Sequence, residues 1–141
     1  MKIGKILTIA GLVILSATAV AGRVSIVPVE INLNEDGSGF ARGNMTTARY
    51  SDNDVEFIGC GTRNTALGDG NLFQFAFCQG RDAADNPIFC STQNPELVAA
   101  VRAIADHSFI IFTFDAQGEC TLIGFSTQSS YLPRGDQEDK N

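Results

Sequence analysis

The hexapeptide IADHSF (104–109) contains three residue types that hydrolases use for nucleophilic catalysis: Asp106, His107, which is the only histidine, and Ser108. In such enzymes histidine takes the serine proton while a carboxylate orients the imidazole, and the three residues come from separate parts of the chain. Three consecutive side chains at the end of a helix point in different directions. We therefore expect a helix terminus here, where a charged His107 would favour the negative end of the helix dipole, and no catalytic relay.

The stretch NLNEDGSG has the spacing of a calcium loop. Asn32, Asn34 and Asp36 occupy alternating positions before Gly37, as the ligands do in D-x-[DN]-x-[DN]-G. The position that should supply a bidentate glutamate is Gly43, and only one of the candidate ligands carries a charge. A hairpin turn explains these residues without a metal.

The remaining motifs point away from catalysis. The sequence has no G-x-S-x-G, no glycine-rich phosphate loop and no C-x-x-C. Asp52, Asp54 and Glu56 alternate in SDNDVE, a pattern typical of a solvated strand edge. No acid lies inside an apolar run, so no carboxylate pair for glycoside cleavage stands out. We therefore predict that the protein is not an enzyme and binds no metal and no cofactor.

Residues 1–21 are typical of an export signal, because two lysines precede an apolar run that ends in Ala-Val-Ala. We predict cleavage after Ala21, leaving a single secreted α+β domain over 22–132 and a disordered polar tail over 133–141. The apolar run is shorter than the roughly 20 residues that a membrane span needs. No span is therefore expected after cleavage, and the expected location is the periplasm or the exterior.

Charge narrows the class of partner. Removal of the signal takes away two lysines and no acid, so the net charge moves from −6 to −8. An acidic chain without a basic cluster repels phosphate backbones, and we expect no binding to nucleic acid. A cationic protein would be attracted by this field.

Four cysteines follow the signal: Cys60, Cys78, Cys90 and Cys120. An even number in an exported chain predicts two disulfides, and spacings of 18, 12 and 30 do not match the close pairs of zinc sites. A hairpin symmetric about Ala84 places Cys78 opposite Cys90. We therefore predict Cys78–Cys90 and, by elimination, Cys60–Cys120, while the other two connectivities stay open.

The apolar pattern predicts a mainly antiparallel sheet with one α-helix over 94–107. Asn94 can cap this helix, Pro95 suits its first turn, and Leu97 begins an apolar stripe at helical spacing. A glycine-bearing loop is expected over 61–71. The expected strands, of which the second is the weakest, cover 24–33, 40–51, 54–60, 72–79, 87–92, 108–115 and 119–127.

Phenylalanine is unusually frequent, with ten residues and no tryptophan. Phe73, Phe75 and Phe77 alternate along one strand, and the hairpin brings Phe89 to the same face. Core packing explains most of the phenylalanines. These four exceed what one helix can cover, so they predict an apolar face for a cationic protein or for self-association.

The series ARYSDNDVEFIGC, FCQGRDAADNPIFC and SSYLP, within about 36–133, resembles small exported bacterial proteins of uncharacterised function. TARYS (47–51) is also similar to a stretch in periplasmic inhibitors of C-type lysozyme, which are small disulfide-bonded β-barrels with a cationic partner. The chain differs from them in its cysteine positions and in lacking tryptophan. We expect a non-enzymatic binding or envelope module; the alternative is an inhibitor of a cationic secreted hydrolase such as lysozyme.

Overall fold

The computed structural model describes residues 22–133, so the predicted signal peptide and residues 134–141 of the predicted tail lie outside the described part. Within 22–133, none of the helices is long and apolar enough to cross a bilayer. The elements of this part are β1 (Glu30–Leu33), β2 (Gly39–Asn44), α1 (Met45–Arg49), β3 (Phe57–Ala66), β4 (Leu72–Arg81), β5 (Pro87–Thr92), α2 (Pro95–Arg102), β6 (Phe109–Phe114), β7 (Cys120–Ser126) and the 3-10 turn η1 (Ser129–Tyr131).

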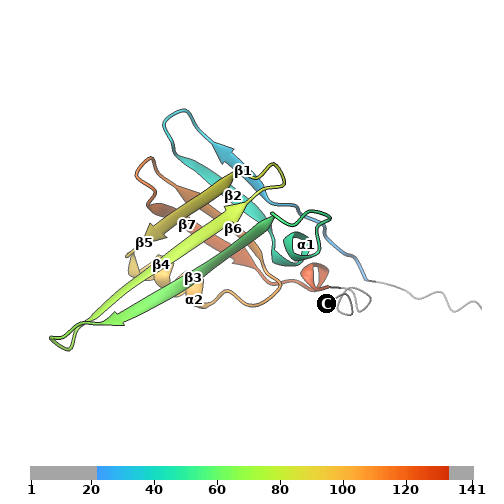
Figure 1. The fold of residues 1–141 in the computed structure, drawn as a ribbon. Coiled ribbons are helices and arrows are strands. Elements are labelled where there is room, and N and C mark those ends of the chain that lie inside the picture. Colours follow the sequence, from blue (N-terminus) through green and yellow to red (C-terminus); the bar gives the residue numbers. More distant parts are fainter. Residues whose placement is uncertain (1–21, 134–141) are drawn as a thin grey trace, which may run out of the picture.

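The strands form two antiparallel sheets (Figure 1). Sheet A has the order β1-β2-β6-β7, and sheet B has the order β3-β4-β5. A parallel bridge between Ser91 and Glu119 brings β5 beside the start of β7, so the sheets meet along this edge. The prediction of a mainly antiparallel α+β fold is confirmed.

The core lies between the inner faces of the two sheets. Ile110, Phe112 and Phe114 alternate along β6 and are buried, and Ala76 and Cys78 of β4 are buried from the side of sheet B. Burying one large apolar side chain stabilises the fold by about 1.5–3 kcal/mol. This alternation makes β6 a principal source of the core.

Helix α2 begins where the sequence predicts but ends earlier. The Oδ1 atom of Asn94 accepts from the backbone N–H groups of Glu96 (3.0 Å) and Leu97 (3.3 Å), so the predicted cap is confirmed. The helix packs against β3, β4 and β7. It ends at Arg102, because the chain must turn back into β6, and His107 adopts a φ of +62° within that turn.

Helix α1 is absent from the sequence-based prediction, which extends a strand over 40–51. The strand β2 ends at Asn44, whose Oδ1 atom accepts from the Thr47 N–H (2.8 Å) and caps the helix. Thr46 and Ala48 are buried. A single helical turn containing two threonines has no apolar stripe long enough to distinguish it from a strand.

The predicted loop over 61–71 is wrong in its first half. Strand β3 continues through Ala66, in register with β4 from Phe57 opposite Arg81 to Ala66 opposite Leu72. Pairing with the strongly patterned β4 overrides the weak strand propensity of this glycine- and asparagine-bearing stretch. The true turn covers 67–71.

The predicted disulfide connectivity is wrong, although the register behind it is right. Cys78 does lie opposite Cys90, but on its other side it lies opposite Cys60, so β4 has a cysteine neighbour on both flanks. The bonds are Cys60–Cys78, with the Cα atoms 4.0 Å apart, and Cys90–Cys120, with the Cα atoms 5.2 Å apart. The first lies within sheet B, and the second joins β5 to β7 and so joins the two sheets.

A bulge explains how Cys120 reaches Cys90. If side chains alternated without interruption through the hairpin of β6 and β7, Cys120 would lie on the same face as Phe109. The register shifts between Thr113 and Phe114, so that Phe114 pairs with Cys120 and both are buried on the inner face. An extra residue in one strand reverses the faces beyond it, which sequence alternation alone does not reveal.

Candidate functional site

Four phenylalanines form a continuous row on the outer face of sheet B, here called the phenylalanine face. The ring centroids of Phe73 and Phe75 lie 5.8 Å apart, those of Phe75 and Phe77 6.3 Å, and those of Phe77 and Phe89 6.0 Å. Phe73 is 41% exposed and Phe89 is 54% exposed. The structure thus brings together all four predicted residues; that this face binds a partner stays a prediction.

The phenylalanine face is open because α2 packs on the opposite side of sheet B, where the alternate residues Ala76 and Cys78 are buried. Within residues 22–133, the outer face is covered locally. Phe77 lies over Gly61, where an added Cβ would be 2.9 Å from the ring, and the guanidinium of Arg63 lies 4.8 Å from the ring centroid. Phe77 is therefore held in place, whereas the rings of Phe73 and Phe89, at the two ends of the face, meet solvent.

Beyond the sandwich, β3 and β4 continue as a two-stranded arm (Figure 1). Strand β5 pairs with β4 only from Ala76 to Arg81, so Leu72–Phe75 pairs with β3 alone. Leu72 is 67% exposed, and Phe73 extends the phenylalanine face onto the arm. Where β5 stops, a hollow of about 240 Å³ lies beside Phe73 and Phe75 and has the carboxylate of Glu119 on its wall.

A larger cavity of about 600 Å³ lies at the other end of β3, here called the acidic cavity. Its walls come from the N-terminal segment 24–28, from α1, from the loop 50–56 and from 130–132. The Ser25 N–H donates to the Ser130 carbonyl (2.8 Å), which holds the two ends of the described chain together at this site. Sequence analysis predicts a strand over 24–33, but only Glu30–Leu33 is one, and the residues before it form this wall.

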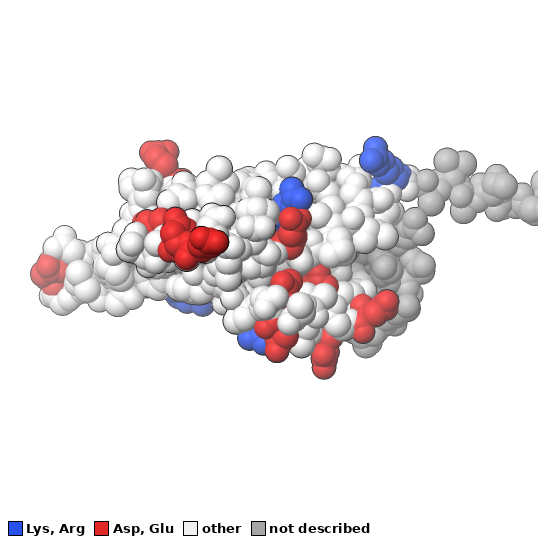
Figure 2. Space-filling model, turned by 90° about the horizontal axis from the view of Figure 1, so that it is seen from above, with Lys and Arg blue, Asp and Glu red and all other residues white. Residues whose placement is uncertain are grey.

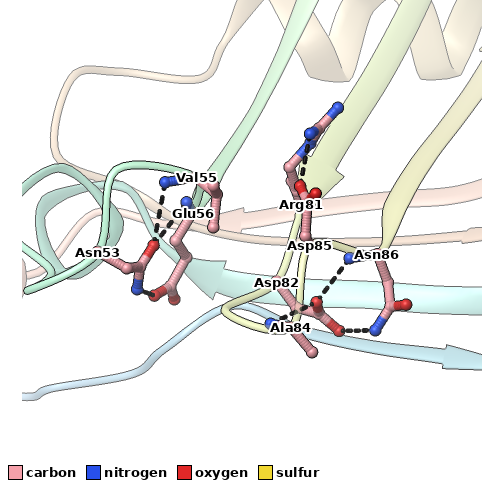
Figure 3. Close-up of polar contacts among 8 residues, drawn as sticks. All are labelled: Asn53, Val55, Glu56, Arg81, Asp82, Ala84, Asp85 and Asn86. Atoms are coloured by element: carbon pink, nitrogen blue, oxygen red, sulfur yellow. Dashed lines mark hydrogen bonds and ion pairs between the residues drawn. The ribbon is translucent and has the colours of Figure 1, made fainter.

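The loop before β3 supplies carboxylates to the cavity and is held rigidly (Figure 3). The Oδ1 atom of Asn53 accepts from the N–H groups of Val55 (3.2 Å) and Glu56 (2.8 Å), and its amide donates to Glu56 (3.1 Å). Glu56 also accepts from the Val29 N–H. The stretch predicted as a solvated strand edge is therefore an ordered loop that places Asp52 and Glu56 on the wall.

The adjacent turn between β4 and β5 adds further acids. Asp82 accepts from the Asn86 backbone N–H (2.9 Å) and side-chain amide (2.9 Å), and these bonds, led by the side-chain one, hold the pKa of Asp82 below its ordinary value. Arg81 forms an ion pair with Asp85 (2.6 Å), so its charge is locally compensated. Acidic side chains outnumber basic ones on the face that Figure 2 shows.

Asn44 is the functional candidate that sequence reasoning missed. It is completely buried and lines the acidic cavity. Its Oδ1 atom caps α1, but its Nδ2 atom has no hydrogen-bond partner among residues 22–133. An unsatisfied buried donor costs about 1–3 kcal/mol. An asparagine directly before a helix is a common N-cap, but the sequence does not reveal α1 and so does not reveal this role of Asn44.

The residues of the opening hexapeptide do not form a relay. The Ser108 hydroxyl donates to the Ala105 carbonyl (2.7 Å), and the Nδ1 atom of His107 lies 3.2 Å from the Thr46 hydroxyl oxygen. The two side chains thus make separate contacts.

The calcium-like stretch forms a turn. Asp36 accepts from the Ser38 hydroxyl (2.6 Å) and backbone N–H (2.9 Å), and these bonds lower the pKa of Asp36. Across 22–133, no group of three or more His, Cys, Asp or Glu side chains is placed to hold a metal ion.

No protein-family model matches this chain, and neither a curated protein nor a solved structure is significantly similar to it. The fold defines the class: a small, β-rich domain stabilised by two disulfides. Disulfides form and persist in oxidising compartments, which is where such a domain belongs.

Proposed function

We propose that the protein is a non-enzymatic binding module of the periplasm or the exterior, and that it holds a cationic exported protein on the phenylalanine face. The observation that carries this proposal is the open row of rings, with Phe73 and Phe89 both exposed by more than two fifths. Aromatic side chains dominate protein–protein contact energy, and exposed apolar faces rimmed by polar groups mark contact sites.

The choice of a cationic protein rests on shape and charge. The face is a row of rings along a sheet, which suits a protein surface better than a small ligand that needs enclosure. A chain with a net charge of −8 after loss of the signal repels nucleic acid and anionic bilayers. Glu119, in the hollow beside Phe73 and Phe75, adds a local negative charge that attracts a cationic rim.

The absence of catalysis is part of the proposal. It is supported by the separate hydrogen bonds of His107 and Ser108 and by the engagement of all four cysteines in disulfides. An assay showing turnover that a single polar substitution abolishes would contradict it.

Site-specific photocrosslinking tests the binding face. A photoreactive phenylalanine analogue replaces Phe73 in the full chain, produced in the organism that encodes it, and the matched control carries the analogue at Leu122. Leu122 is 45% exposed on the outer face of sheet A. We expect a covalent adduct with a basic exported protein from position 73 only, and loss of most of this adduct in the Phe89→Ser background.

Other outcomes contradict the proposal. An adduct between two copies of the chain would show self-association instead. Equal adducts from both positions, or none from position 73, would remove the phenylalanine face as a binding site.

A second candidate function is inhibition of a cationic secreted hydrolase such as lysozyme. It is favoured by the position of the stretch TARYS at the acidic cavity. The stretch TARYS, on which the resemblance to lysozyme inhibitors rests, forms the end of α1 and the turn after it. Thr47, Tyr50 and Ser51 line the acidic cavity. Retention of a C-type lysozyme on the immobilised protein, with loss of its cell-wall hydrolysis, is the expected result; no retention at low or moderate salt would end this candidate.

A further inference from the structure

The wall of the acidic cavity contains two acidic residues. Asp52 and Glu56 lie on it, and among residues 22–133 no lysine or arginine lines it. Arg23 and Arg49 stand next to wall segments in the sequence, but neither is part of the wall. The cavity therefore suits a cationic group, which the negative charges of Asp52 and Glu56 attract.

The wall also presents a donor. The Nδ2 atom of Asn44 is buried without a partner in the described part of the chain, while the other end of the same amide is fixed by its bond to the Thr47 N–H. The amide cannot be reversed without losing the cap of α1. Its free N–H groups require an acceptor, such as a carbonyl oxygen, at the cavity.

Aromatic surface completes the site. Tyr50 and Tyr131 both line the cavity, and the Tyr131 ring is held by stacking on Phe109 at a centroid distance of 5.9 Å. A cation near a tyrosine ring gains about 0.5–2 kcal/mol, depending on its exposure. Carboxylate, aromatic ring and amide donor thus lie around one space of about 600 Å³.

We propose that the acidic cavity binds a lysine or arginine side chain presented on an extended segment of another protein. The cationic head is held by Asp52 and Glu56 against the tyrosine rings, and a main-chain carbonyl of the same segment accepts from Asn44 Nδ2. A metal ion fits less well, since the described residues offer no group of three ligands. The proposal uses none of the phenylalanine face, so either can fail without the other.

Titration calorimetry and NMR on the full chain test this site with blocked tripeptides. The probes are acetyl-Gly-Lys-Gly-amide and acetyl-Gly-Arg-Gly-amide, with acetyl-Gly-Gln-Gly-amide as the neutral control. We expect the cationic peptides to bind at least about tenfold more tightly than the neutral one, a difference equivalent to about 1.4 kcal/mol. Amide shifts should localise to α1 and the loop 50–56.

Two variants separate the parts of the site. Asp52→Asn should weaken the lysine peptide about tenfold, whereas Asp69→Asn, which removes the same charge at the tip of the arm, should change it less than twofold. Asn44→Ser keeps a capping oxygen and adds no charge but removes the amide donor, and should weaken binding of the lysine peptide. Circular dichroism and thermal melting confirm that each variant is folded.

Three results would overturn the proposal. These are equal binding of the lysine and glutamine peptides, equal losses in Asp52→Asn and Asp69→Asn, and unchanged binding of the lysine peptide in a folded Asn44→Ser variant. Equal binding of the two peptides would show that the cavity does not recognise a positive charge. Equal losses in the two aspartate variants would show that only the net charge of the protein matters. Unchanged binding in the Asn44 variant would show that Asn44 does not contact the peptide carbonyl. A Phe73→Ser variant should bind the peptides normally, which separates this site from the phenylalanine face.

Discussion

Removing the Cys90–Cys120 bond should cost more stability than any exposed substitution, because within 22–133 it is the disulfide that crosses between the two sheets. It closes a segment with a sequence separation of 30, which contains α2 and β6. Loop-closure entropy then gives about 3.6 kcal/mol for Cys90→Ala/Cys120→Ala, against about 3.2 kcal/mol for Cys60→Ala/Cys78→Ala. Both Cys90 and Cys120 are buried, so the smaller alanines also lose packing contacts.

Urea unfolding measures this loss. A typical domain has a total stability of about 5–15 kcal/mol, so a loss near 3.6 kcal/mol should lower the midpoint strongly. Cys60→Ala/Cys78→Ala is the matched control. A loss below about 1 kcal/mol in the Cys90→Ala/Cys120→Ala protein would refute the role assigned to the bond between the sheets.

The same cysteines test the connectivity directly. In a single Cys90→Ala variant, alkylation of the unfolded protein without reductant should label Cys120 alone, because Cys60 and Cys78 remain joined. Peptide mass mapping reads the result. Labelling of Cys78 instead would mean that Cys78 pairs with Cys90 and that the pairing in the structure is wrong.

Three further predictions concern the core, a helix cap and acid stability. Phe112→Ala should lower the unfolding free energy by about 3–5 kcal/mol, since Phe112 is fully buried between the sheets; calorimetry checks this. Asn94→Ala should cost about 1 kcal/mol and reduce hydrogen-exchange protection in α2 first, and unchanged protection would contradict the capping role. Because hydrogen bonds from Asn86 hold the pKa of Asp82 below 3.8, its contribution is present above that value and is lost as the pH falls through the lower folded-state pKa. Asp82→Asn should therefore flatten the acid limb of a stability–pH curve, and an unchanged limb would contradict this.

Much of sheet B could be predicted from local pattern. Strand β5 covers the predicted stretch 87–92, and β4 contains the predicted stretch 72–79. Alternation of large apolar and small residues fixes both the face and the register of such a hairpin. The start of α2 was also readable, because Asn94 and Pro95 act through local backbone geometry.

The rest depended on contacts that local pattern does not encode. Cys60 joins Cys78 because β3 extends beside β4, and that extension overrides a loop-like sequence. Cys120 faces Cys90 because of a bulge next to Phe114. The wall of the acidic cavity comes from four separate segments of the chain, and the free amide of Asn44 becomes visible only when they are assembled.

The length of β3 has a consequence for how many molecules the protein can hold at once. The acidic cavity lies just before Phe57, and the apolar arm lies at the Ala66 end, ten residues further along. An extended strand of that length spans roughly 30 Å. Ligands at the two ends would not collide, so a saturating lysine tripeptide should not compete with a protein on the arm, and a ternary complex of 1:1:1 stoichiometry is sterically allowed.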